Sequence, residues 1–436
     1  MRRACLNIVA LLCGATLLSS VAGAQYPKVA KQKAGSLDGE VVSAKGAPVA
    51  EAQILWQAAD GETPHVLHTD AHGRFHIDPL RTGIYEVRAS AGGAWSEWER
   101  NVVVRPGTAA NVTLRLSFKA PPPAAVVELK GTMRTWDVPI PASLPHDPTV
   151  DPKGNIWFTL QETGHLARFN PDTHEWKLFK VPTPKSGPQG LVSDLSGNIW
   201  FTENQAGKIG RLNAQSGLIT EYATHLAKDP HTLVFGPDGA LWFTSEDSNI
   251  VGRMDMETRK IAEYGVPTQD AHPYGMVLAD DGGLWFCEFA GGRLARVEPK
   301  SGVITEFTPE FADFTSGDSN LQPRRLAAVT GAIYFTDSRG GRLGRLTLAD
   351  KKFKFWDSPS GKNSQPYGIA ADSTGKIWYE ESAATANKLV SFDPSAEIFK
   401  VFPMPGPDSS VFNIARDAHG RLWMPLPMTN KIAVVD

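Results

Sequence analysis

One phrase recurs seven times between residue 150 and the end of this 436-residue chain. It consists of a turn glycine, an aliphatic residue and a pair of large side chains that begins with tryptophan or tyrosine. The copies lie 43, 42, 43, 49, 44 and 45 residues apart and centre on Trp157, Trp200, Trp242, Trp285, Tyr334, Trp378 and Trp423. A period near this length is typical of propeller blades. The repeat therefore predicts an all-β chain with a seven-bladed β-propeller over residues 132–436.

Each copy of the repeat holds several short strand signals. The second blade, for example, predicts strands over residues 198–202, 208–212 and 219–222, with an apolar strand before the turn glycine. The last copy stops after its third strand, and residues 133–138 resemble the missing fourth one. Pairing these two ends would close the ring and remove an exposed strand edge.

A separate unit over residues 35–118 precedes the ring, followed by a proline-rich linker over residues 119–131. Its alternating strands and glycine turns, such as Asp70–Phe75 and Gly83–Val87, resemble the carboxypeptidase regulatory-like domain, a prealbumin-like β-sandwich. That resemblance implies an accessory module with a possible role in carbohydrate binding. Trp56, Trp95 and Trp98 offer stacking faces for sugar rings, or they fill the sandwich core, which is the commoner role of aromatics in small domains.

The first 24 residues read as a secretory signal peptide. Arg2 and Arg3 precede an apolar run from Leu6 to Leu18, and Ala22–Ala24 offers small residues for cleavage. We expect a secreted or periplasmic protein. No later stretch approaches the ~20 apolar residues of a membrane span. The mature chain would keep Cys287 alone and a net charge of −5, which is the −3 of the whole chain less Arg2 and Arg3. We expect a monomer that binds no nucleic acid.

Candidate ligand-binding residues lie just before the first strand of each blade, where propeller loops converge on the channel mouth. The position 11 residues before each repeated aromatic, or 10 in the fifth blade, gives a polar and varied ring: His146, Gln189, His231, Tyr274, Arg324, Tyr367 and Phe412. Acids follow the second strands at Glu203, Glu246, Glu288, Asp337, Glu380 and Glu381. Such acids suit a hard divalent cation, or they pair with the third-strand arginines Arg211, Arg253, Arg296 and Arg345.

The phrases Gly197–Glu203 and Lys208–Leu212 resemble the virginiamycin B lyase family, with similarity over residues 132–436. The resemblance implies a carbon–oxygen lyase that opens cyclic streptogramin esters by elimination, with a magnesium ion and a histidine base. Carried over to the third blade, it makes His231 the catalytic base and Asp229 and Glu246 the metal ligands. Gln189, His146, Tyr274, Arg324 and Tyr367 are the expected substrate-binding residues. The family places this cluster in its last blade, where this chain has Phe412 and Pro427.

Two other functions fit the same sequence. One is a secreted propeller without catalysis that binds a glycan or peptide, using Tyr274, Tyr367, Phe412 and the long segment from Phe311 to Leu321 at the mouth. The other is a metal-dependent lactone hydrolase similar to the gluconolactonase propellers. Elimination leaves the substrate mass unchanged, hydrolysis adds a water, and a binding protein changes nothing.

Overall fold

The computed structural model describes residues 34–58, 65–92, 94–97, 99–116, 118–119, 125–128, 133–309, 321–382, 387–406 and 409–435. The predicted signal peptide, Trp98 and the segment 310–320 lie outside this description. No helix of the described residues is long and apolar enough to cross a membrane. The chain divides into two compact units, Met1–Lys119 and Ala120–Asp436.

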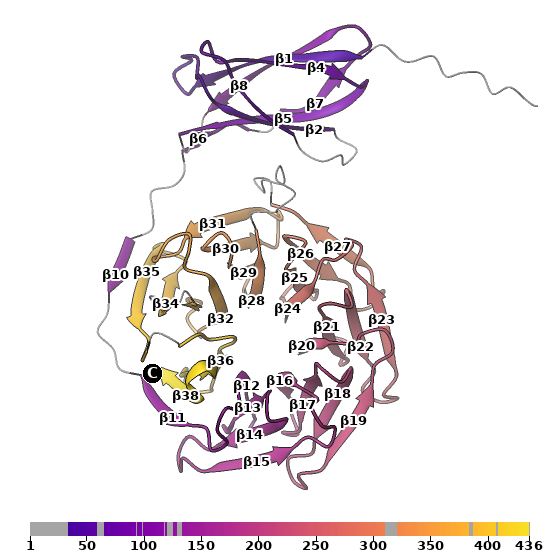
Figure 1. Ribbon diagram of the computed structural model, residues 1–436, viewed down its shortest axis with the longest axis vertical. Coiled ribbons are helices and arrows are strands. Elements are labelled where there is room, and N and C mark those ends of the chain that lie inside the picture. The colour runs from indigo at the N-terminus through magenta and orange to yellow at the C-terminus, as the bar shows by residue number, and fades with distance from the viewer. Residues whose placement is uncertain are drawn as a thin grey trace, which may run out of the picture. The chain divides into compact units, whose positions relative to one another are not determined.

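The first unit is the predicted β-sandwich, and Figure 1 shows its two sheets. One sheet has the order β4-β1-β8, with β1 and β8 parallel; the other has the order β3-β2-β5-β6-β9, with β7 also paired to β5. The first sheet comprises β1 (Gly35–Ser43), β4 (Arg74–Leu80) and β8 (Ala109–Leu116). The second comprises β2 (Gln53–Ala58), β3 (His65–His68), β5 (Gly83–Ala91), β6 (Ala94–Trp95), β7 (Glu99–Val104) and β9 (Phe118–Lys119).

Trp56 belongs to the sandwich interior. It packs against the apolar cluster between the sheets, and its ring stacks on His65 with the ring centroids 4.4 Å apart. The side chain is half-buried, so it packs against the core, in partial agreement with the commoner interpretation.

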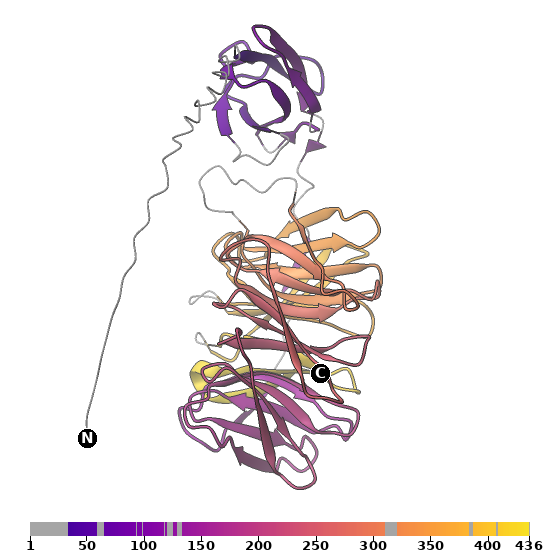
Figure 2. The ribbon, with the colours of Figure 1, turned by 90° about the vertical axis from the view of Figure 1, so that its right-hand side faces the viewer.

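The described residues of the second unit form a ring of seven sheets, with the ring seen face-on in Figure 1 and from the side in Figure 2. The first strand of each sheet lines the channel: β12 (Pro145–Val150), β16 (Pro188–Ser193), β20 (Pro230–Phe235), β24 (Pro273–Leu278), β28 (Pro323–Val329), β32 (Pro366–Ala371) and β36 (Ala415–Arg416). The second strands are β13 (Ile156–Leu160), β17 (Ile199–Glu203), β21 (Leu241–Ser245), β25 (Leu284–Glu288), β29 (Ala332–Asp337), β33 (Ile377–Glu381) and β37 (Leu422–Leu426).

The third strands are β14 (His165–Phe169), β18 (Lys208–Leu212), β22 (Ile250–Met254), β26 (Arg293–Val297), β30 (Arg342–Thr347), β34 (Lys388–Asp393) and β38 (Lys431–Val435). The fourth strands are β15 (Trp176–Lys180), β19 (Ile219–Ala223), β23 (Ile261–Gly265), β27 (Ile304–Phe307), β31 (Phe353–Asp357), β35 (Ile398–Pro403) and β11 (Arg134–Asp137). A single 3-10 turn, η1 (Pro427–Thr429), joins β37 to β38.

The repeated phrase has a packing reason in each of its parts. Five of the six repeated tryptophans are buried and Trp378 is half-buried; their indole N–H groups donate to an aspartate of the preceding turn, as Trp157 does to Asp151 at 2.9 Å. The phenylalanine that follows the tryptophan fills the space above the third strand. A Cβ on Gly210 would lie 2.1 Å from the ring of Phe201, so a larger residue here would require this ring to move.

The two ends of the ring meet in one sheet. β11 pairs antiparallel with β38, which confirms the predicted closure. Trp136 stacks on Trp423 at 5.7 Å, and Val138 is buried in the same cluster. The segment assigned to the linker holds one further strand, β10 (Ala125–Glu128), which pairs parallel with β35 and covers the outer edge of the sixth blade.

Candidate functional site

Threonines of the second strands fix the backbone of the channel residues. The Thr202 hydroxyl accepts the N–H of Gly190 in its own blade at 2.9 Å and donates to the His231 carbonyl of the next blade at 2.9 Å. Thr159, Thr244 and Thr336 donate in the same way to the carbonyls of Gln189, Tyr274 and Tyr367. Because each bond links two blades, the channel residues are held in register around the ring.

The residue that follows each predicted mouth residue is polar in the odd-numbered blades and glycine in the even-numbered blades. The odd blades carry Asp147, Thr232, Arg325 and Asn413, and the even blades carry Gly190, Gly275 and Gly368. A Cβ on Gly190 would lie 2.2 Å from the His231 carbonyl oxygen, so the glycine lets the neighbouring blade approach. Space in the channel therefore remains for the polar side chains of the odd-numbered blades.

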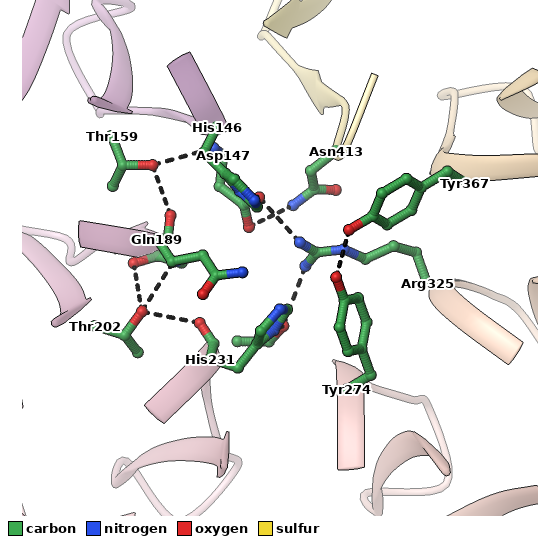
Figure 3. A network of polar contacts seen from close by, with 12 residues as sticks. His146, Asp147, Thr159, Gln189, Thr202, His231, Tyr274, Arg325, Tyr367 and Asn413 are labelled. Carbon is green, nitrogen blue, oxygen red and sulfur yellow. Dashed lines mark hydrogen bonds and ion pairs between the residues drawn. The ribbon is translucent and has the colours of Figure 1, made fainter. Parts of the chain in front are cut away.

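A buried ion pair crosses the channel, as Figure 3 shows. Arg325 Nη2 lies 3.0 Å from Asp147 Oδ1, and both side chains are 3% exposed. Asn413 donates to the other Asp147 oxygen at 3.1 Å, and Arg325 Nη1 donates to the Thr232 hydroxyl at 3.1 Å. Burial alone would raise the pKa of Asp147, but the Arg325 guanidinium and the His146 side chain outweigh it and hold that pKa well below its usual range.

A cavity of about 290 Å³ continues the channel below this ion pair, on the side away from His231. Arg325 and Asp147 border it, and apolar residues one position further along the inner strands form its walls, among them Leu191, Leu233 and Ile369. The ion pair therefore separates this cavity from the predicted mouth residues.

His231 belongs to the same network from the third blade (Figure 3). Its Nδ1 lies 2.9 Å from the Thr232 hydroxyl oxygen, and its Nε2 is buried with no hydrogen-bond partner. Burial, followed by the positive charge of Arg325, holds the pKa of His231 well below its ordinary value of 6.5. The ring is thus neutral at neutral pH, and when Nδ1 donates to Thr232 the lone pair lies on Nε2.

Aromatic rings connect most of the other predicted mouth residues. The His231 ring centroid lies 4.0 Å from that of Tyr274, and the Tyr274 and Tyr367 hydroxyls are hydrogen-bonded. Tyr367 and Phe412 are 5.2 Å apart, and Phe412 is 4.6 Å from His146. We call this run from His231 to His146 the aromatic arc. Arg324 lies over Tyr367 at 4.4 Å, whereas the predicted ligand residue Gln189 lies between Thr159 and Thr202 (Figure 3).

Among the described residues, the expected pairing of strand-end acids with third-strand arginines holds for Asp337, which lies 2.6 Å from Arg342, but not for the four arginines named in the sequence analysis. Arg253 instead binds Asp238 at 2.8 Å and Arg296 binds Asp281 at 3.2 Å, the turn aspartates beneath the tryptophans. The Glu203 and Glu288 carboxyls are fully buried without a hydrogen-bond partner. Burial raises the pKa of each to about 8, and the neighbouring carboxylates Glu221 and Glu306 add to the shift.

The two predicted metal ligands differ in what their carboxylates already bind. Asp229 accepts hydrogen bonds from the Ser245 and Ser248 hydroxyls and from the backbone N–H groups of Asp247 and Ser248. These four donors occupy the sites that a cation would use. Glu246 instead belongs to a cluster of possible metal ligands. One side-chain oxygen or nitrogen atom from each of Glu246, Asp247 and His272 lies within 4.8 Å of the other two.

Sequence reasoning missed Asp147, Arg325 and Asn413, the polar residues at the centre of the channel. Each of these three residues directly follows a predicted mouth residue in the sequence. The signal was present, because glycine occupies that next position in alternate blades. The partners lie 178 residues apart in the ion pair, so only the ring geometry brings them together.

Two family models match separate parts of the chain: the virginiamycin B lyase family at residues 123–316 and the carboxypeptidase regulatory-like domain at residues 36–117. Both predicted resemblances are thereby confirmed. No curated protein sequence matches the chain.

Solved structures give the same result. A streptogramin B lyase structure is 25% identical with a TM-score of 0.63, covering 70% of this chain and 97% of that one. Virginiamycin B lyase from Staphylococcus aureus is 26% identical with a TM-score of 0.62, covering 70% and 98%. A catalytically inactive histidine-to-alanine variant of that enzyme with quinupristin is also 26% identical, with the same coverage and a TM-score of 0.61.

Proposed function

We propose that this virginiamycin B lyase-like propeller is a carbon–oxygen lyase that opens cyclic esters by elimination. The observation that carries the proposal is the state of His231. It is neutral because of burial and Arg325, and its Nε2 has no hydrogen-bond partner among the residues that the structure describes. A neutral imidazole with a free ring nitrogen is what a general base requires, and such a base contributes ~10² to 10⁴ in rate.

The surrounding residues would orient this base. Thr232 holds Nδ1, and Arg325, fixed by Asp147, holds Thr232. The proton next to the ester would move to Nε2, while the Tyr274 ring beside the histidine keeps water away from it. His146, Tyr367 and Arg324 would contact the rest of the substrate at the aromatic arc, with Gln189 on the other side of His231.

A divalent cation, such as the predicted magnesium ion, would stabilise the negative charge that develops on the substrate carbonyl. Asp229 does not fit a ligand role, because its carboxylate is already engaged by four donors. The residues that fit are Glu246, Asp247 and His272, since their side-chain donor atoms converge and are 26%, 82% and 33% exposed. His272 lies two residues before Tyr274, so this cluster is on the mouth side of the ring.

Secretion remains part of the proposal. The N-terminal arginines and the apolar run of residues 6–18 support export to the periplasm or the medium, where the chain would meet antibiotics and other cyclic esters.

A second candidate function is ligand binding without catalysis. The half-buried Phe412 favours it, because this ring packs against the buried Tyr367 and offers the exposed part of the aromatic arc to a glycan or an aromatic peptide.

Incubation of the mature chain with a streptogramin B, with and without magnesium, tests both candidates. Chromatography with mass detection should give a shifted peak of unchanged mass for elimination. A mass gain of one water would indicate hydrolysis instead. An unshifted peak in the presence of magnesium would contradict the lyase proposal and leave the binding function.

A further inference from the structure

Arg324 is a cation for which the described part of the chain supplies no acidic partner. Its side chain is half-buried, its Nε has no hydrogen-bond partner, and no ion pair joins it to a carboxylate among the described residues. The arginine next to it in sequence behaves differently, since Arg325 is neutralised by Asp147. Arg342 on the same blade also has an acid, Asp337, at 2.6 Å.

Two aromatic rings hold the Arg324 guanidinium in place. Its Cζ lies 4.4 Å from the centroid of Tyr367 and 5.0 Å from that of Phe289. Stacking of this kind uses the faces of a planar guanidinium and leaves its N–H edge available for a carboxylate. The charge is therefore positioned but not neutralised within the described protein.

Two tyrosine rings connect Arg324 to the proposed base, His231. Tyr367 is hydrogen-bonded to Tyr274, whose ring contacts His231, and Phe289 lies 5.6 Å from Tyr274. Arg324 and His231 thus lie on either side of the same tyrosine pair. Both tyrosines are buried, so the half-buried Arg324 is the charged group at the outer side of this contact chain.

We infer that Arg324 binds the carboxylate that the ring-opening reaction releases, and that the site takes esters whose acid part leaves in this form. This inference rests on the proposed function. In the elimination, the proton of the carbon next to the ester-bearing carbon moves to His231, and its electron pair forms a carbon–carbon double bond. The carbon–oxygen bond breaks, its electrons go to the ester oxygen, and the acid part becomes a carboxylate.

Binding of two synthetic probes tests the assignment: the linear acid formed when a streptogramin B is opened, and the same molecule with its carboxylate converted to an amide. Calorimetry should show the wild-type chain binding the acid about tenfold or more tightly than the amide, since charge-assisted bidentate pairs are strong. Arg324→Gln should bind both probes equally.

Arg211→Gln is the matched control. Arg211 also lies over an aromatic ring, at 5.5 Å from Trp200, but on a third strand away from the channel. It should keep the preference of the wild-type chain for the acid. Thermal melting of both variants verifies that the fold is kept.

The outcomes separate this inference from the proposed function. A wild-type chain that opens the antibiotic but binds acid and amide equally, or that binds neither, overturns the role of Arg324 and leaves the lyase intact. A chain that prefers the acid through Arg324 but opens no streptogramin supports the carboxylate site and overturns the lyase.

Discussion

At the scale of single residues, the channel is organised by one buried ion pair. Asp147 and Arg325 come from opposite parts of the ring, and the hydrogen bonds of Asn413 and Thr232 complete their shell. Burial and the same guanidinium lower the pKa of His231. The charge that pairs with Asp147 in the channel therefore also keeps the proposed base neutral. The spacing of the repeat predicts that His231 lies at the channel mouth. It does not predict the contact between Arg325 and Asp147.

Removal of Arg325 should destabilise the chain strongly. Arg325→Met leaves the Asp147 carboxylate buried without its cation, and loss of one partner of such a pair costs about 3–5 kcal/mol. Urea unfolding measures this loss. Arg253→Met, which breaks the more exposed pair with Asp238, should cost about 1 kcal/mol or less. Equal losses in the two variants would contradict a buried, energetically coupled pair.

At the scale of strands, the second strand of each blade carries both the packing and the titratable groups. The repeated tryptophans alone predict where these strands lie, because aromatic residues at this fixed period are typical of the strands of propeller blades. They do not predict that Glu203 and Glu288 at the strand ends are buried without an arginine partner. That depends on the loops before the first strands, whose Pro188 and Pro273 pair with Glu203 and Glu288, and on how these loops pack in the folded ring.

The buried carboxyls should make the chain less stable as the pH rises. Burial raises the pKa values of Glu203, Glu288 and Glu380 to about 8, above their ordinary value of 4.5. Between these values the folded chain holds protons that the unfolded chain has released, so the free energy of unfolding falls as pH increases. The decrease should be complete somewhat above pH 8.

Urea midpoints at a series of pH values check this dependence. The double variant Glu203→Gln with Glu288→Gln should show a flatter profile, whereas Glu257→Gln, at an exposed turn position, should follow the wild-type chain. A double variant with an unchanged slope would show that these carboxyls are ionised in the folded state.

At the scale of the whole molecule, closure of the ring determines whether the blades act together. The first and last parts of the propeller share the β11–β38 ladder, and four antiparallel partners hold it. Sequence reasoning predicted this closure because the last copy of the repeat lacked a strand. It could not predict β10, whose four residues carry no blade phrase and pair with β35 through backbone bonds.

Deletion of residues 134–138 should abolish cooperative unfolding of the propeller. The deletion removes β11 and the buried Val138, and it leaves the edge of β38 and the face of Trp423 without cover. Differential scanning calorimetry should then show a broad transition or none. A single sharp transition at the wild-type temperature would mean that the ring does not depend on this strand.

The most direct test of the proposed lyase is turnover of a streptogramin B by His231→Ala, measured as the appearance of the opened product of unchanged mass. His225→Ala, an exposed histidine of the loop that leads into the same blade, is the control. We expect His231→Ala to melt like the wild-type chain and to form no product, while His225→Ala retains wild-type turnover. Product formation by His231→Ala at the wild-type rate would contradict the assignment of His231 as the base.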